Sequence, residues 1–122
     1  MMRDLTNEMV RGQSFAPAAR TPASSNGTGV DLRNTGPEVY VEVQVGAISG
    51  STTLDLSLEE SDDNSAFTAI PDSALTQITA QNQVVTKCVI NRTKRYVRAV
   101  AVVATATSIL FGVSLAGQKQ SY

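Results

Sequence analysis

Apolar and polar residues alternate with a period of two along several stretches of the chain. Every second residue is valine from Val39 to Val45, and every second residue is leucine from Leu54 to Leu58. Successive side chains of an extended backbone point to opposite faces, so this pattern predicts half-buried β-strands. We expect the valines and leucines to face a core and the residues between them to face water or a partner.

The same pattern and its punctuation predict a series of short strands from Pro37 onward. Gly, Pro, Asn, Asp and Ser separate the apolar stretches, and connections this short cannot contain crossover helices, so neighbouring strands should run antiparallel. The predicted strands are 38–47, 52–60, 66–70, 75–79, 83–91, 95–104 and 108–116. The last two are apolar on both faces, as central strands or strands covered by another subunit are. The whole is typical of an all-β protein, an antiparallel β-sandwich or jelly-roll.

The first 36 residues differ in composition from the rest. The stretch 11–36 is rich in Ser, Thr, Ala, Gly, Asn and Pro and has little with which to build its own core. We therefore expect an extended N-terminal arm at 1–36 and a sandwich domain at 37–122. The arm is either a disordered tail or a segment that docks on a neighbouring subunit. Docking would use its apolar anchors Met2, Leu5, Met9, Val10 and Phe15.

Composition narrows the function classes. The 122 residues suffice for one domain, and the net charge of -1 lacks the basic excess of a nucleic-acid binder. The single cysteine, Cys88, cannot form an intrachain disulfide or a cysteine metal cage, and we expect it to be a small apolar residue in a strand. The longest apolar stretch, 97–106, is well short of the roughly 20 residues that span a bilayer. The N-terminus lacks the apolar run of a secretory signal, so we expect a soluble protein without membrane or nucleic-acid partners.

Charge is distributed unevenly along the chain. Between Asp31 and Asp72 every charged residue but Arg33 is acidic, and from Ser73 to the end every charged residue is basic. Pairing of the acidic and basic halves across strands, or complementarity to another subunit, would explain this pattern better than phosphate binding does. The candidate interface residues in the basic cluster are Arg92, Arg95 and Arg98.

The acidic segment 59–64 is a candidate calcium site, because it concentrates oxygen ligands. A calcium loop of the EF-hand type needs Asp or Asn at alternate positions, a glycine and a later glutamate. Here the acids are contiguous and no glycine is present, so a solvated hairpin turn is favoured and no metal is expected.

The chain contains few of the residue types and motifs that enzymes commonly use for catalysis. The chain has no histidine, and it lacks both a nucleophile elbow and a glycine-rich phosphate loop. A pair of carboxylates brought together in space would escape sequence inspection. We expect a non-enzymatic binding protein with no cofactor and no small-molecule substrate.

Four sequence pieces occur in a distinctive order along about residues 28 to 116. They are Val30-Asp31-Leu32, Val45-Gly46-Ala47, the run from Leu58 to Ile70, and Lys94-Arg95-Tyr96-Val97-Arg98. In these pieces the chain resembles small structural proteins of tailed bacteriophages that are encoded near the major capsid protein. The resemblance implies a virion component made in the host cytoplasm. Its expected role is that of a jelly-roll cement or decoration protein, which binds the major capsid protein on the outer capsid surface as a homotrimer.

Two other roles remain open. A head–tail connector or tail component would also be a small β protein, but it would form rings or stacked hexamers. A host-adhesion module would expose aromatic residues to glycans, and this chain has no Trp and 3 Tyr.

Overall fold

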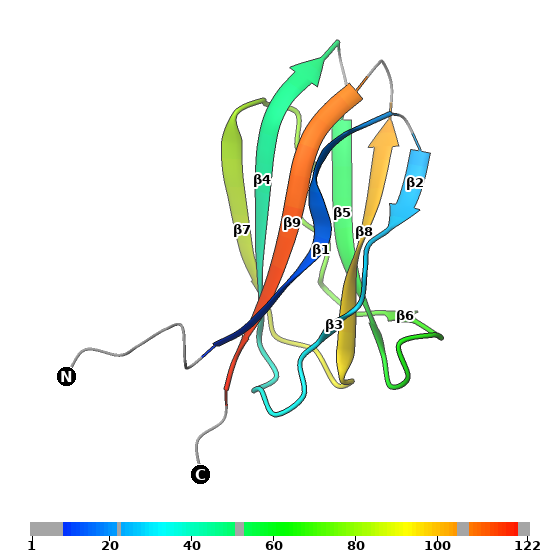
Figure 1. Ribbon diagram of the computed structural model, residues 1–122, viewed down its shortest axis with the longest axis vertical. Coiled ribbons are helices and arrows are strands. Elements are labelled where there is room, and N and C mark those ends of the chain that lie inside the picture. Colours follow the sequence, from blue (N-terminus) through cyan, green and yellow to red (C-terminus); the bar gives the residue numbers. More distant parts are fainter. Residues whose placement is uncertain (1–8, 22, 51–52, 105–107, 120–122) are drawn as a thin grey trace, which may run out of the picture.

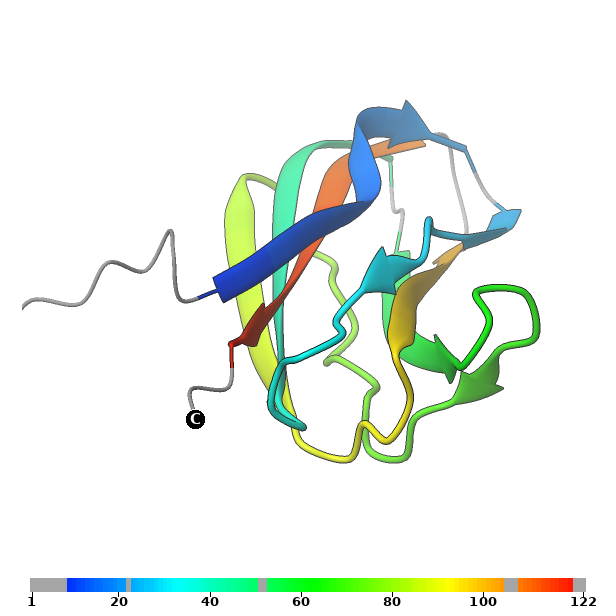
Figure 2. The same ribbon diagram turned by 60° about the horizontal axis from the view of Figure 1, so that its bottom comes forward.

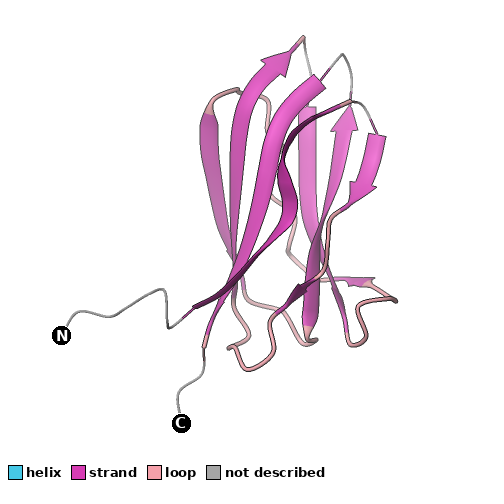
Figure 3. Cartoon of the chain, viewed as in Figure 1, coloured by secondary structure: helices cyan, strands magenta, loops and turns pink. Residues whose placement is uncertain are grey.

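Two antiparallel β-sheets pack face to face in the computed structural model, which describes residues 9–21, 23–50, 53–104 and 108–119 (Figures 1 and 3). Sheet A has the strand order β1 (Met9–Arg20), β9 (Ser108–Gln118), β4 (Val39–Ser49), β7 (Gln83–Val89). Sheet B has the order β2 (Ala23–Asn26), β8 (Tyr96–Ala104), β5 (Thr53–Ser61), β6 (Thr68–Ala69), and β3 (Val30–Asp31) also pairs with β8. The predicted all-β sandwich is confirmed.

The alternation of apolar residues sets which face of each strand is buried. Val41 and Val43 of β4 and Leu56 of β5 are almost fully buried, whereas the residues between them are more accessible. The strands β8 and β9 are bonded on both sides, to β2 and β5 and to β1 and β4 respectively. They are therefore the central strands that the sequence predicted, but their outward apolar side chains are not covered by other described residues: Val102 of β8 and Leu110 of β9 are each 39% exposed.

Most strands predicted from Pro37 onward are observed within a few residues of their expected bounds, but the strand predicted at 75–79 is wrong. There the chain forms an isolated bridge between Leu54 and Ile78. The amides of Leu75 and Ile78 donate to the carbonyls of Leu56 and Leu54, both at 2.9 Å. The segment thus follows β5 and buries its apolar side chains without adding a regular strand.

The described residues of the range 9–36 are part of the sandwich, which corrects the arm predicted at 1–36 and its boundary at residue 36. β1 pairs with β9 in sheet A, and β2 and β3 pair with β8 in sheet B (Figure 2). Phe15, Val30 and Leu32 are 6%, 6% and 0% exposed. The segment contributes separate strands to two sheets, so its buried apolar residues are few and widely spaced. Its composition therefore resembles that of an arm, although the segment is part of the domain. Residues 1–8 lie outside the described part of the chain.

A β-bulge at Ser14 ties this segment to both sheets. The register of β1 against β9 shifts beside Ser14, so Ser14 and Phe15 are both buried. The Ser14 hydroxyl accepts a hydrogen bond from the Ala99 amide of β8 at 2.8 Å and donates one to the Thr28 carbonyl at 2.9 Å. Gly27 passes so close that a Cβ there would lie 2.2 Å from Ser14 Oγ. The crossing between the two sheets therefore requires a glycine.

Asn and Asp occupy the strained positions of the turns. The non-glycine residues with positive φ among those described are Asn34, Asn64, Asp72 and Asn82. These residue types tolerate the left-handed region better than others do. The last three lie in turns that the sequence predicted.

Candidate interaction surface

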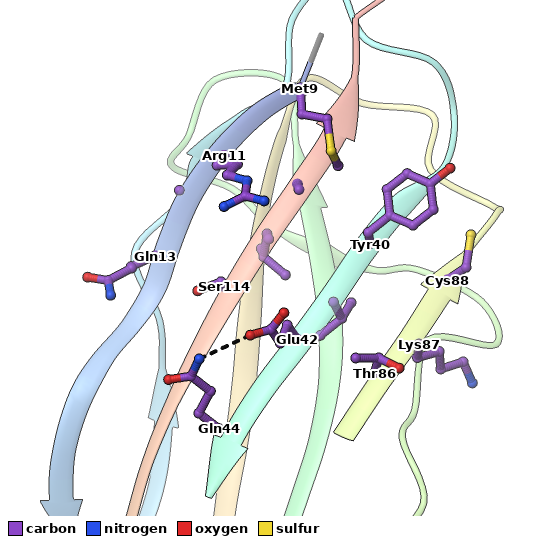
Figure 4. A pocket seen from close by; sticks show the side chains of 14 residues that line it. Met9, Arg11, Gln13, Tyr40, Glu42, Gln44, Thr86, Lys87, Cys88 and Ser114 are labelled. Carbon is purple, nitrogen blue, oxygen red and sulfur yellow. Dashed lines mark hydrogen bonds between the residues drawn. The ribbon is translucent and has the colours of Figure 1, made fainter. Parts of the chain in front are cut away.

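The outward face of sheet A carries an open groove of about 700 Å³ (Figure 4). Strand register arranges its side chains in rows across β1, β9, β4 and β7. Two neighbouring rows are Arg11, Ala116, Tyr40 and Cys88, followed by Gln13, Ser114, Glu42 and Thr86. The floor lies over β9, where the outward residues Ser114 and Ala116 are small.

Within the described part of the chain, few hydrogen bonds occupy the polar groups of this groove. The Gln44 amide donates to the Glu42 carboxylate at 3.0 Å (Figure 4). Among the ion pairs of the described residues, none involves Arg11 or Glu42. The groove thus offers a cation, a carboxylate, amides and hydroxyls, together with the ring of Tyr40. This set of groups suits binding through hydrogen bonds.

The arginines of the basic cluster are bound within the sandwich. The Arg95 and Arg98 guanidiniums each lie 2.7 Å from a carboxylate oxygen, of Asp31 and Glu59 respectively. Each pair joins the acidic half of the chain to the basic half, which confirms the predicted pairing across strands. Arg98 also lies over the ring of Phe67, at 4.0 Å from its centroid.

The ion pair between Asp31 of β3 and Arg95, the residue before β8, changes the pKa values of its members. Hydrogen bonds from Arg95 lower the pKa of Asp31 from 3.8 to about 2, and Asp31 in turn raises the pKa of Arg95. The third arginine of the cluster, Arg92, is partly buried, and this burial lowers its pKa. It donates to the carbonyls of Gly36 and Lys94 and to the Thr35 hydroxyl. The three arginines of the cluster therefore bind other segments of the same chain. Their role in an interface stays a prediction.

The apolar anchors predicted in the arm have different positions. Phe15 is in the core, where its ring lies 5.5 Å from that of Phe111, so it is not available to a partner. Val10 packs against the core, and Met9 lines the groove of sheet A (Figure 4). Met2 and Leu5 fall outside the described residues.

The acidic segment forms a turn in which protein donors occupy the carboxylate of Asp63. Its Oδ1 accepts hydrogen bonds from the amides of Ala66 and Ser65 and from the Ser61 hydroxyl, at 2.8 to 3.0 Å. These bonds, that from Ala66 foremost, lower the pKa of Asp63. Glu60 is buried and accepts from the amide and hydroxyl of Thr93. In the described part of the chain, no three His, Cys, Asp or Glu side chains are grouped to hold a metal ion.

Sequence reasoning missed part of this surface. The alternation in β4 predicted that Tyr40, Glu42 and Gln44 face outward, but nothing placed Arg11 and Gln13 beside them. Those two residues belong to β1, whose partner β9 is about a hundred residues distant along the chain. Polar residues at alternate positions, 11 and 13, were the available signal.

The fold and this surface define an antiparallel β-sandwich with a polar groove on one outer face. Within that class the chain belongs to the Bbp16 family, whose model matches residues 18–114. No curated protein matches the chain. No helix among the described residues is long and apolar enough to cross a membrane.

Solved structures share the fold. The chain is similar to the PBSX exported protein XepA, with a TM-score of 0.65 and 18% identity over 93% of this chain and 38% of XepA. It therefore spans well under half of XepA. A Bacillus endospore appendage protein has a TM-score of 0.43 and 11% identity, over 93% of this chain and 92% of that protein. A family two carbohydrate esterase from Cellvibrio japonicus has a TM-score of 0.36 and 12% identity, over 93% and 36%. The TM-score with XepA indicates a common fold, whereas the TM-scores with the other two proteins are too low to indicate one.

Proposed function

We propose that this protein is a non-enzymatic structural component of a tailed bacteriophage, a cement protein that binds the major capsid protein on the outside of the head. The observation that carries the proposal is the outward face of sheet A, where Arg11 and Glu42 have no ion-pair partner among the described residues and Tyr40 is 39% exposed. The fold is shared with the PBSX exported protein XepA, and the phage origin is proposed from the resemblance of the four sequence pieces to tailed-bacteriophage structural proteins.

The architecture suits a clamp on a shell. A sandwich whose two sheets are tied by Ser14, and whose sheet B is braced by the ion pairs of Arg95 and Arg98, presents its outer faces with little internal freedom. Binding by a preorganised surface loses less conformational entropy than binding by a flexible one. A homotrimer would place several such faces on neighbouring capsid subunits and multiply weak contacts through effective concentration.

Co-sedimentation with phage heads that lack this protein tests the proposal. We expect the full chain to sediment with the heads and to raise the temperature at which they release DNA. Binding to purified tails or necks and not to heads would support the connector or tail role instead. Failure to bind any virion part would overturn the proposal.

A matched pair of variants tests whether the face of sheet A makes the contact. Tyr40 in sheet A and Val102 in sheet B are both 39% exposed on their outer faces. We expect Tyr40→Ala to weaken head binding by about tenfold, as loss of an aromatic interface residue often does, and Val102→Ala to leave it unchanged. The opposite result would assign the contact to sheet B.

A further inference from the structure

The edge strands of the two sheets are protected unequally against pairing with other chains. At the edges, β1 has two register shifts and contains Pro17, β2 is 4 residues long, and β6 is 2 residues long. Bulges, prolines and short length are the means by which native sheets keep their edges from pairing. Three of the edges therefore carry a recognised form of protection.

The remaining edge, β7, has none of these features. It pairs with β4 in unbroken register over its 7 residues, from Gln83 to Val89, and contains no proline. Its charged residue is Lys87, whose amine donates to the Ala74 carbonyl at 2.8 Å. Among described residues, no backbone hydrogen bond joins β7 to any segment other than β4. β7 forms the outer margin of sheet A in both ribbon views (Figures 1 and 2).

The outward side chains of this edge form an uncharged stripe: Val84, Thr86, Cys88 and, one residue past the strand, Ile90. Val84 and Ile90 are 61% and 66% exposed, the highest values among the exposed large apolar residues described. When another strand pairs with such an edge, exposed β-branched side chains pack against it and the backbone groups are hydrogen-bonded, so the exposed edge carries no penalty in stability. Uncovered, they form a site for aggregation.

We propose that β7 is a docking edge, to which an extended segment of the capsid partner adds as a further strand of sheet A. Main-chain hydrogen bonds would hold the segment, and its apolar side chains would pack on Val84 and Ile90. Charge favours a partner strand that is neutral except for a basic side chain beside Thr86. Such a side chain would reach Glu42, which lies directly opposite Thr86 on β4 and forms no ion pair within the described residues. The identity of the partner rests on the proposed function.

The size of the edge favours a tethered segment over a second free copy. A strand pair of 7 residues buries far less than the roughly 1,200 Å² of a stable interface between two free proteins. On an assembled shell, by contrast, many segments are held close to many β7 edges, and effective concentration strengthens each contact. The edge therefore fits a lattice better than a dimer in solution.

The single cysteine of the chain, Cys88, gives a direct test because its side chain is exposed on this strand. The full chain is treated with iodoacetamide in two states: free, and bound to heads that were prepared without it. Mass spectrometry of this chain then measures the rate at which Cys88 is alkylated. We expect binding to slow alkylation by about tenfold or more, and to slow backbone hydrogen exchange across 83–91 but not across 23–26. Slower alkylation at higher protein concentration without heads would assign the edge to a second copy and overturn the proposal.

Paired variants separate this inference from the proposed function. The double variant V84K/I90K adds two charges to the stripe, and S24K/N26K adds the same charges to exposed positions of β2. We expect both to melt like the wild type, and V84K/I90K alone to bind heads about tenfold more weakly. Undiminished binding by V84K/I90K, with unchanged Cys88 alkylation, overturns the docking edge and leaves the function standing. Absence of binding by the wild type overturns the function and the partner assigned to this edge.

Discussion

Buried polar residues in the interior have their hydrogen-bonding partners within the chain, and one of them, Ser14, holds the N-terminal segment. Ser14 is buried, yet its hydroxyl both donates and accepts a hydrogen bond. Glu60 is buried too, and two donors from Thr93 satisfy its carboxylate. Burying polar groups is tolerated when such partners are present. The partner of Ser14 in β8 is 85 residues away along the chain, so no local pattern could reveal it.

Replacement of Ser14 by alanine should lower the free energy of unfolding by about 1–3 kcal/mol, because it leaves the buried Ala99 amide without an acceptor. Urea denaturation of the two proteins measures the difference. Ser24→Ala is a suitable control, since Ser24 is exposed on β2 and should change stability by less than about 0.5 kcal/mol. Equal stability of the two variants would contradict the role assigned to Ser14.

At the scale of elements, a strand could be predicted when its own sequence specifies its buried face, and could not when that face depends on pairing with a distant strand. β4 and β5 could be predicted because their alternating valines and leucines alone specify which face is buried. β1 could not, because its bulge places Ser14 and Phe15 on the same side and breaks the period of two. The groove was predicted in part for the same reason: its wall on β4 follows from alternation, whereas its wall on β1 follows from a long-range register.

The register of β5 can be tested with two adjacent residues. Leu56 is 3% exposed, and Leu56→Ala should cost about 2–5 kcal/mol of unfolding free energy through a core cavity. Asp55 faces outward and accepts hydrogen bonds from the exposed Gln77, so Asp55→Ala should cost less than about 1 kcal/mol. Thermal or urea melts compare the two. Similar losses would be inconsistent with the inward orientation of Leu56.

For the whole molecule, the segment before Pro37 completes both sheets. It covers one side of β9 with β1 and one side of β8 with β2 and β3. It also contributes Phe15, Val30 and Leu32 to the common core. A sandwich without these strands would expose the edges of its two central strands and lose part of the area that stabilises it.

A chain reduced to residues 37–122 should therefore fail to give a cooperative thermal transition by circular dichroism, whereas the full chain should give one. The reduced chain should also expose apolar surface and bind a hydrophobic dye. A cooperative transition within a few degrees of that of the full chain would show that the first strands are an accessory to an independent domain.

The pairing of β1 with β9 also governs how the molecule responds to force. Met9 is paired with Gln118 and Arg20 with Ile109, so the N-terminal end of β1 and the C-terminal end of β9 lie at the same end of sheet A. Tension applied between Met9 and Gln118 would pull across the strands and open their hydrogen bonds one pair at a time, as a zipper opens. Tension along a strand would instead load all of its bonds together. A protein fixed to a shell through these two ends would peel at low force, and one fixed through β7, along the strand direction, would resist shear.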